Sequence, residues 1–206
     1  MSLDKKSFYP LFESICVMDG EIIRPEIHEE RYQLSYRLHF GKSPTGALLE
    51  GIEVPIDFQK GRVKLRVMYN QNDRVHSFSN YIYQPINSLK CVDGSLVDYA
   101  TKKTNRKDLE DCFAQRGNCD DVLIIKKGKI TDTSYGNICF WDGSDWFTPK
   151  RPLLKGTARA HLIAEGIIKE VPLRVEEIKK FQGFKIINAM RDFATTPMIS
   201  IKQLYI

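Results

Sequence analysis

Tight polar turns divide this chain, and each turn separates two short apolar segments. Asp19 and Gly20 follow the apolar residues 14–18, and Asp-Gly is one of the strongest signals for a two-residue hairpin. Apolar residues alternate with polar ones around NQND at 70–73, which is typical of half-buried strands. We predict two further hairpins. One is VLIIKKGKIT at 122–131, and the other consists of the strands NICFW and WFTP on either side of the turn DGSD at 142–145.

Helical patterns lie between these hairpins. Pro25 suits the first turn of a helix, and Gly41 marks its end. The predicted apolar face of this helix carries Ile27, Arg31, Leu34 and Leu38. Two of the other predicted helices lie at 46–51 and 156–170. A further helix is predicted to begin at Thr104 or Asn105 and to end at Gly117, with an apolar face of Leu109, Cys112 and Phe113.

The alternation of hairpins and helices predicts an α/β class of fold, with mixed sheets of α+β type in two lobes. The pattern pauses after the second hairpin and resumes at Asp98. We therefore expect a smaller N-terminal lobe at 1–86, a connection at 87–97 and a second lobe at 98–206 that ends in strands near 185–190 and 198–206.

The composition of the 206 residues is that of a folded globule, with 42% hydrophobic and 28% charged residues. No apolar run approaches the roughly 20 residues that span a bilayer, and the first residues lack the apolar core of a signal peptide. We therefore expect a cytoplasmic protein that does not enter a membrane.

Cysteine and histidine spacing predicts neither a disulfide framework nor a metal site. The five cysteines are an odd number without a C-x-x-C pair, and the four histidines are scattered. A net charge of +5 permits a basic nucleic-acid-binding module as a non-enzyme alternative to a solvated surface. The lysines around residue 102 lack interleaved aromatic residues, which is unfavourable for nucleic-acid binding.

Three stretches carry candidate chemistry, and each has an ordinary structural alternative. Lys102 stands where the second lobe begins, so partial desolvation would make its amine a usable nucleophile, whereas a basic helix start is usually exposed. Gly156 and Thr157 open a helix, whose free N–H groups can bind an anion, although every helix has such an end. Asp132 lies between two predicted strands, either in a polar turn or facing a cofactor cation.

The order of these stretches resembles the class IV aminotransferase family, which includes branched-chain and D-amino-acid aminotransferases and aminodeoxychorismate lyase. The family begins with a hairpin similar to FESICVMDG at 12–20, followed by H-x-x-R, here His28 and Arg31. Its K-x-x-N-R motif matches Lys102 to Arg106. The later matches are Thr131, Asp132, Asn137 and Ile138, then Thr148-Pro149, Gly156 to Arg159, Asn188-Ala189 and Pro197-Met198.

The resemblance implies a pyridoxal-5′-phosphate enzyme with the two-lobe fold of this family. It implies that Lys102 carries the cofactor as a Schiff base and moves a substrate proton, whereas Lys103 falls on a variable, exposed position. Asp132 would face the pyridine nitrogen. The implied phosphate cup consists of Arg31, Gly156, Thr157, Asn188 and Ala189, and Asn137 is a further cofactor-binding position. A small amino-acid-like substrate and a homodimer are also implied.

The short K-x-x-N-R spacing favours aminodeoxychorismate lyase, which forms 4-aminobenzoate and pyruvate. A D-amino-acid or branched-chain aminotransferase remains the alternative within the family. The chain departs from the family pattern at three points: it has no GDG before the first strand, Cys16 replaces an arginine, and Asp132 replaces a glutamate. The N-terminal lobe is also shorter than in most members, which leaves open a member that keeps the cofactor but has lost turnover.

Overall fold

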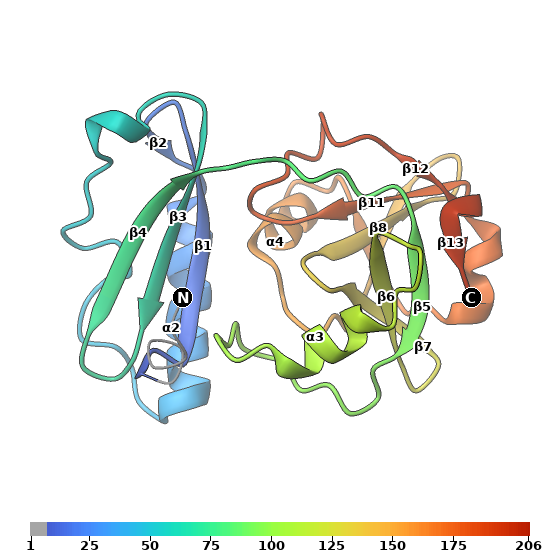
Figure 1. Cartoon of the computed structure of the whole chain (residues 1–206), viewed down its shortest axis with the longest axis horizontal. Coiled ribbons are helices and arrows are strands. Elements are labelled where there is room, and N and C mark those ends of the chain that lie inside the picture. Colours follow the sequence, from blue (N-terminus) through green and yellow to red (C-terminus); the bar gives the residue numbers. More distant parts are fainter. Residues whose placement is uncertain (1–7) are drawn as a thin grey trace. The chain divides into compact units, whose positions relative to one another are not determined.

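The computed structural model describes residues 8–206, which fall into two compact units (Figure 1). The first unit comprises the described residues through Tyr83 together with Thr101–Asn105, and the second comprises Gln84–Ala100 and Arg106–Ile206. Both units contain β-sheet and helix, so the predicted mixed α/β class is confirmed. Residues 1–7, where no leader is expected, lie outside the described range. No helix within 8–206 combines the length and apolar character needed to cross a membrane.

The first unit contains a four-stranded antiparallel sheet in the order β2-β1-β3-β4. Its strands are β1 (Leu11–Met18), β2 (Glu21–Ile22), β3 (Arg62–Tyr69) and β4 (Arg74–Asn80). Asp19 and Gly20 both adopt positive φ, at 49° and 87°, which is the backbone of a type I′ hairpin turn. The antiparallel pairings of β1 with β2 and of β3 with β4 confirm the hairpins predicted at 19–20 and 70–73. These predictions succeed because the residues of each turn determine its conformation.

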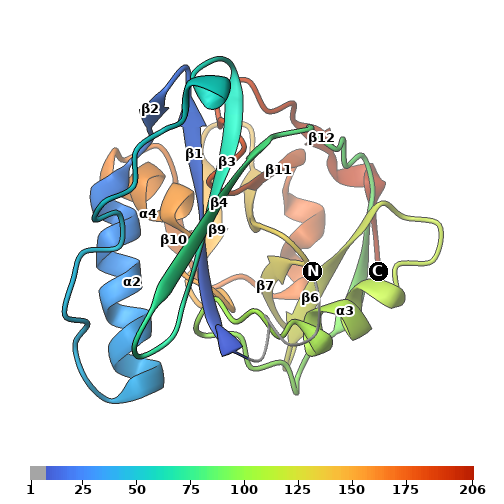
Figure 2. The ribbon, with the colours of Figure 1, turned by 60° about the vertical axis from the view of Figure 1, so that its left-hand side comes forward.

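Helix α2 (Pro25–Phe40) lies along one face of this sheet (Figure 2). Pro25 occupies the first turn and Gly41 caps the end with φ 72°, as predicted. The predicted buried face is wrong: Leu34 is 42% and Leu38 64% exposed. The helix instead buries His28, Tyr32, Ser35 and Tyr36. Two of these are large aromatic side chains, and the ring of Tyr32 packs edge-on against Tyr69 with centroids 4.8 Å apart.

The helix predicted at 46–51 is absent, and this correction has a local cause. Residues 48–51 form a turn, in which the backbone N–H of Leu48 donates to the Glu29 carboxylate at 2.6 Å and Gly51 has φ 71°. A glycine at either end leaves too few residues for a helical nucleus. The segment continues into the single turn η1 (Ile56–Phe58).

The second unit is built on a nine-stranded mixed sheet in the order β10-β9-β8-β7-β6-β5-β13, with β11 pairing β8 and β12. Apolar side chains of β6, β8 and β11 form its main core, with Phe140 and Phe184 fully buried. The hairpins predicted at 122–131 and 137–149 are confirmed. The strands are β5 (Leu89–Asp93), β6 (Asp121–Lys126), β7 (Lys129–Thr133), β8 (Asn137–Trp141), β9 (Trp146–Pro149), β10 (Lys169–Val171), β11 (Gly183–Ile187), β12 (Ile199–Ser200) and β13 (Leu204–Tyr205).

Three elements of the second unit differ from the sequence expectation. The stretch 87–97, expected as a connection, contains β5, whose parallel pairing with β6 is a long-range contact. Helix α3 (Lys107–Ala114) begins after Arg106, later than Thr104 or Asn105, because Thr104 bonds to the backbone of Tyr9 and Pro10. Helix α4 (Thr157–Ala164) is shorter than 156–170 because Gly166 takes a positive φ. The unit also contains two short 3-10 helices, η2 (Val175–Lys180) and η3 (Ile201–Gln203).

Candidate active site

A buried ion-pair cluster joins β1 to α2 in the first unit. The Glu13 side chain is fully buried and accepts hydrogen bonds from Arg31 Nε at 2.9 Å, from Arg31 Nη2 and from His28 Nδ1 at 2.8 Å. Burial alone would raise the pKa of Glu13, but the charge of Arg31 and these hydrogen bonds lower it to about 2. Glu13 is therefore an anion that fixes the orientation of the Arg31 guanidinium.

Lys102 is held beside this cluster by β1. The backbone N–H of Phe12 donates to the carbonyl of Lys102 at 3.0 Å, and Lys102 Nζ lies 4.8 Å from the centre of the Phe12 ring. The charge of Lys102 also acts on His28. Burial lowers the pKa of His28, and the positive charge of Lys102 lowers it further. The structure therefore brings Lys102 and Arg31 into one unit, although Lys102 lies 71 positions after Arg31 in the sequence.

Lys103 differs from its expected position. The sequence predicts an exposed side chain, but Lys103 is partly buried like Lys102. The reason is an antiparallel bridge between Lys103 and Leu11, which draws the segment Thr101–Asn105 against the first unit.

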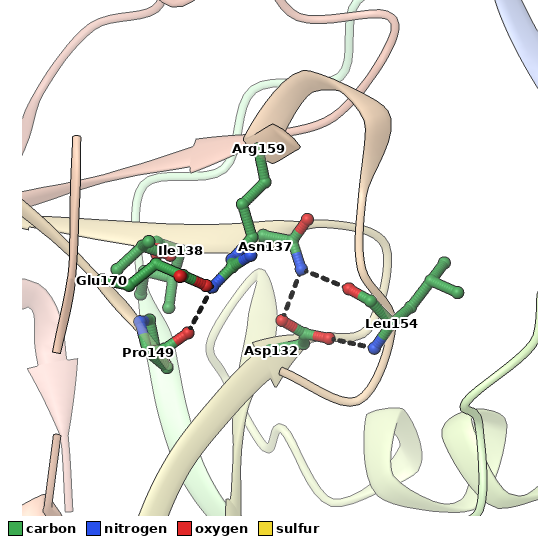
Figure 3. Close-up of polar contacts among 8 residues, drawn as sticks. Asp132, Asn137, Ile138, Pro149, Leu154, Arg159 and Glu170 are labelled. Atoms are coloured by element: carbon green, nitrogen blue, oxygen red, sulfur yellow. Dashed lines mark hydrogen bonds and ion pairs between the residues drawn. The ribbon is translucent and has the colours of Figure 1, made fainter. Parts of the chain in front are cut away.

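Asp132 and Asn137 form the polar centre of the second unit (Figure 3). Asn137 Nδ2 donates to Asp132 Oδ1 at 2.7 Å and to the carbonyl of Leu154 at 2.8 Å, and the backbone N–H of Leu154 donates to Asp132 Oδ2 at 2.9 Å. Asp132 lies within β7 and is 5% exposed, so its expected location between two strands is wrong. Burial raises its pKa to about 6, despite these hydrogen bonds and the charge of Arg159.

Gly156 lies directly against Asn137. A Cβ atom at Gly156 would come within 2.0 Å of Asn137 Oδ1, so no larger residue fits without displacing the amide. Gly156 is the residue before α4, and Thr157 opens the helix with its side chain buried, as the sequence predicts. Arg159, in the same turn, is bonded to Pro149 O and Glu170 (Figure 3).

Asn188 and Ala189 follow β11 and are partly buried. Asn188 Oδ1 accepts from the backbone N–H of Met190 at 2.9 Å, and Asn188 Nδ2 donates to the carbonyl of Tyr135 at 3.2 Å. Tyr135 lies in the turn between β7 and β8, so Asn188 is connected to the strands that carry Asp132 and Asn137.

The sequence-predicted residues thus form two groups, Arg31 with Lys102 in the first unit and the other six in the second. Sequence reasoning gave no role to Glu13 or His28. A carboxylate in the apolar strand 11–18, with a histidine and an arginine three residues apart on the following helix, was the available signal. Within residues 8–206, no group of three or more His, Cys, Asp or Glu side chains is arranged to hold a metal ion.

Residues 10–196 match the model of the amino-transferase class IV family. The chain belongs to this family. An uncharacterized protein of Haemophilus influenzae is 39% identical over 187 residues, covering 88% of this chain and 98% of the relative. A solved structure from Haemophilus somnus, provisionally assigned as a 4-amino-4-deoxychorismate lyase, is 30% identical with a TM-score of 0.78, covering 88% of this chain and 96% of that chain.

A hypothetical aminotransferase from Mycobacterium tuberculosis, solved in its pyridoxal-phosphate-bound form, has a TM-score of 0.72. It is 18% identical over 95% of this chain and 81% of that chain, which indicates the shared fold alone. The family is pyridoxal-phosphate dependent, so the chain is an enzyme of the aminotransferase or lyase type. The family match therefore supports the enzyme and not the alternative of a non-enzymatic nucleic-acid-binding module.

The residues of the second unit fit this cofactor. The Asn137 amide and the Leu154 backbone N–H, which donate to Asp132, are both neutral, so the buried carboxylate would gain from a cationic ring nitrogen. The start of α4 offers backbone N–H groups of the kind that bind phosphate.

Proposed function

We propose that this protein is an aminodeoxychorismate lyase, which releases 4-aminobenzoate and pyruvate. The observation that carries the proposal is the likeness to the Haemophilus somnus protein, at 30% identity over 88% of this chain. The spacing of Lys102, Asn105 and Arg106 supports the same activity. On this proposal the protein acts in folate biosynthesis in the cytoplasm, since 4-aminobenzoate is a folate precursor.

Eight residues would hold the cofactor. Lys102 forms the covalent link, Asp132 pairs with the ring nitrogen, and Asn137 orients that carboxylate. The phosphate is held by Arg31, Gly156, Thr157, Asn188 and Ala189. When bound, pyridoxal phosphate supplies an electron sink for the carbanion that develops at the substrate α-carbon.

Lys102 then acts as the general base of the reaction. Its Nζ takes the α-proton of the substrate and holds it close to the reacting carbon. The aromatic face of Phe12, 4.8 Å from Nζ, stabilises the ammonium form that results. Phe12 and Lys102 are also joined through the backbone, so the amine and the ring are positioned together.

Asp132 provides the negative charge that keeps the ring nitrogen protonated. A cationic ring nitrogen beside Asp132 would favour the ionised carboxylate and would oppose the effect of burial, which raises the pKa of Asp132. The hydrogen bonds from Asn137 and Leu154 fix the carboxylate plane, so the charge is already oriented before substrate arrives.

Arg31 provides the charged contact to the phosphate. Glu13 holds its guanidinium in place through two hydrogen bonds, so less side-chain entropy is lost when the phosphate binds.

We also propose that the active protein is a homodimer. Light scattering on the cofactor-loaded protein would test this by distinguishing the mass of a dimer from that of a monomer.

The decisive test is turnover of aminodeoxychorismate with no keto acid added. A lyase needs no amino acceptor, so 4-aminobenzoate should accumulate far beyond one equivalent per active site. An aminotransferase would instead convert one equivalent of a D-amino or branched-chain amino acid per active site and then stop until a keto acid is supplied as amino acceptor. Lack of reaction with aminodeoxychorismate, combined with turnover of amino acids in the presence of a keto acid, would reject the lyase.

A further inference from the structure

The turn at residues 133–136 separates Asp132 in β7 from Asn137 in β8. It is closed by Thr133, whose backbone N–H and hydroxyl both donate to the carbonyl of Gly136, at 2.9 and 3.1 Å. A Cβ atom at Gly136 would lie 2.8 Å from the carbonyl oxygen of Ile187, so the turn packs tightly against β11. The geometry of this turn therefore sets how Asp132 and Asn137 face each other.

Arg106 holds the same turn from the start of α3. Its Nη2 donates to the carbonyl of Ser134 at 2.5 Å, and its guanidinium carbon lies 4.4 Å from the centre of the Tyr135 ring. Its Nη1 also donates to the hydroxyl of Tyr99 at 3.3 Å. A planar cation with several donors can satisfy these contacts together, whereas a lysine ammonium cannot.

Two further contacts make the turn a junction of the second unit. Asn188, at the end of β11, donates to the carbonyl of Tyr135 at 3.2 Å. The Tyr135 ring packs edge-on against Phe113 of α3, with centroids 6.3 Å apart. The turn thereby links α3 to the strands that carry Asp132, Asn137 and Asn188.

We propose that Arg106 is a positioning residue of the cofactor site, which holds the 133–136 turn and through it the Asp132 carboxylate and the Asn188 amide. The proposal rests on the proposed function, because it takes Asp132 and Asn188 as cofactor contacts. Arg106 is also where the chain re-enters the second unit, four residues after Lys102.

Arg116 provides a matched control. It is another arginine near the end of α3 that stacks on an aromatic ring, with its guanidinium carbon 4.1 Å from the centre of Phe113. Its Nη1 donates to the carbonyl of Phe113 at 3.2 Å, three residues away. Within residues 8–206, Arg116 is linked to the turn only through the Phe113 ring that packs on Tyr135, so loss of Arg116 leaves the hydrogen bond from Arg106 to Ser134 in place.

The experiment compares Arg106→Ala, Arg106→Lys and Arg116→Ala with the unaltered protein. Hydrogen exchange of the cofactor-free protein should be about tenfold faster in peptides covering 133–137 for Arg106→Ala, because a hydrogen bond and a cation–π contact are lost. A titration with pyridoxal phosphate should show about tenfold weaker affinity for the same variant. Arg106→Lys should recover part of both effects, and Arg116→Ala should show neither.

Unchanged exchange in both Arg106 variants would overturn the proposal, as would equal acceleration in Arg116→Ala. If Arg106→Ala does not fold, Arg106→Lys decides alone, and normal exchange with normal affinity in that variant rejects the role. The proposed function fails separately, if the cofactor links to a lysine other than Lys102 or if aminodeoxychorismate is inert. Normal Arg106 variants in a protein that still links its cofactor through Lys102 would reject only the Arg106 proposal.

Discussion

Asn137 Nδ2 donates at once to Asp132 Oδ1, at 2.7 Å, and to the carbonyl of Leu154, at 2.8 Å. One amide thus ties a buried carboxylate to the loop that precedes α4. The Leu154 backbone N–H donates to the other carboxylate oxygen, so both oxygens of Asp132 accept hydrogen bonds from uncharged donors. The orientation of this buried carboxylate is therefore fixed, and within residues 8–206 no direct ion pair offsets the free energy of removing its charge from water.

Lys102→Ala should abolish covalent attachment of pyridoxal phosphate, and with it the visible absorbance of the loaded protein. Lys103→Ala is the matched control and should retain the absorbance, because Lys103 contributes a backbone bridge to Leu11 that alanine preserves. Borohydride reduction followed by peptide mass mapping should find the cofactor on Lys102. A label on Lys103 would show that the assignment is off by one residue.

Asp132→Asn should lower kcat by a larger factor than it lowers cofactor affinity. The substitution removes the negative charge that favours a protonated ring nitrogen, and this charge matters most as carbanion character develops in the transition state. Steady-state kinetics and a cofactor titration on the same preparation measure the two factors. Full activity in the variant would remove Asp132 from the site.

Asp132 should also make the cofactor-free protein less stable as pH rises from about 4 to about 6. Its pKa is raised on folding, from 3.8 to about 6, so in this window the folded state holds a proton that the unfolded state has released. The loss should be roughly 3 kcal/mol at most. Urea unfolding of the unaltered protein and Asp132→Asn at several pH values checks this, and parallel pH curves for the two proteins would contradict it.

Arg31→Ala should weaken cofactor affinity about tenfold to a hundredfold, since a charge-assisted hydrogen bond contributes roughly 1.5–3 kcal/mol. It should also destabilise the fold by about 3–5 kcal/mol, because Glu13 stays buried without its main partner. The double variant Glu13→Gln with Arg31→Ala should recover much of the stability but none of the affinity. Recovery of affinity in the double variant would show that Arg31 acts only on the fold.

Gly156→Ala should destabilise the protein by about 1–3 kcal/mol, the usual cost of an added methyl group without space. The new Cβ would meet Asn137 Oδ1 at 2.0 Å, and two hydrogen bonds hold that amide in place. Combining Gly156→Ala with Asn137→Ala removes the collision. Thermal unfolding should therefore show a smaller effect of Gly156→Ala in the Asn137→Ala background, and equal effects in both backgrounds would contradict the steric account.

The sequence by itself determined the hairpins and the two ends of α2. Asp19 with Gly20 and the polar turns at 70–73 and 142–145 have local conformational preferences that need no distant partner. Pro25 and Gly41 delimit α2 for the same reason. The ordered motifs around Lys102, Asp132 and Gly156 likewise identify the family, because motif order is a property of the chain.

Only the tertiary structure decided which side chains are buried and what they bond. The face of α2 that packs on the sheet is set by Tyr32 against Tyr69, residues far apart in sequence, and not by the helical spacing of Leu34 and Leu38. Glu13 became a partner of Arg31 because β1 and α2 pack together, and Asp132 lies within a strand because β7 pairs with β8. A polar group can be buried only where the fold supplies its hydrogen-bond partners, and those partners come from distant parts of the chain.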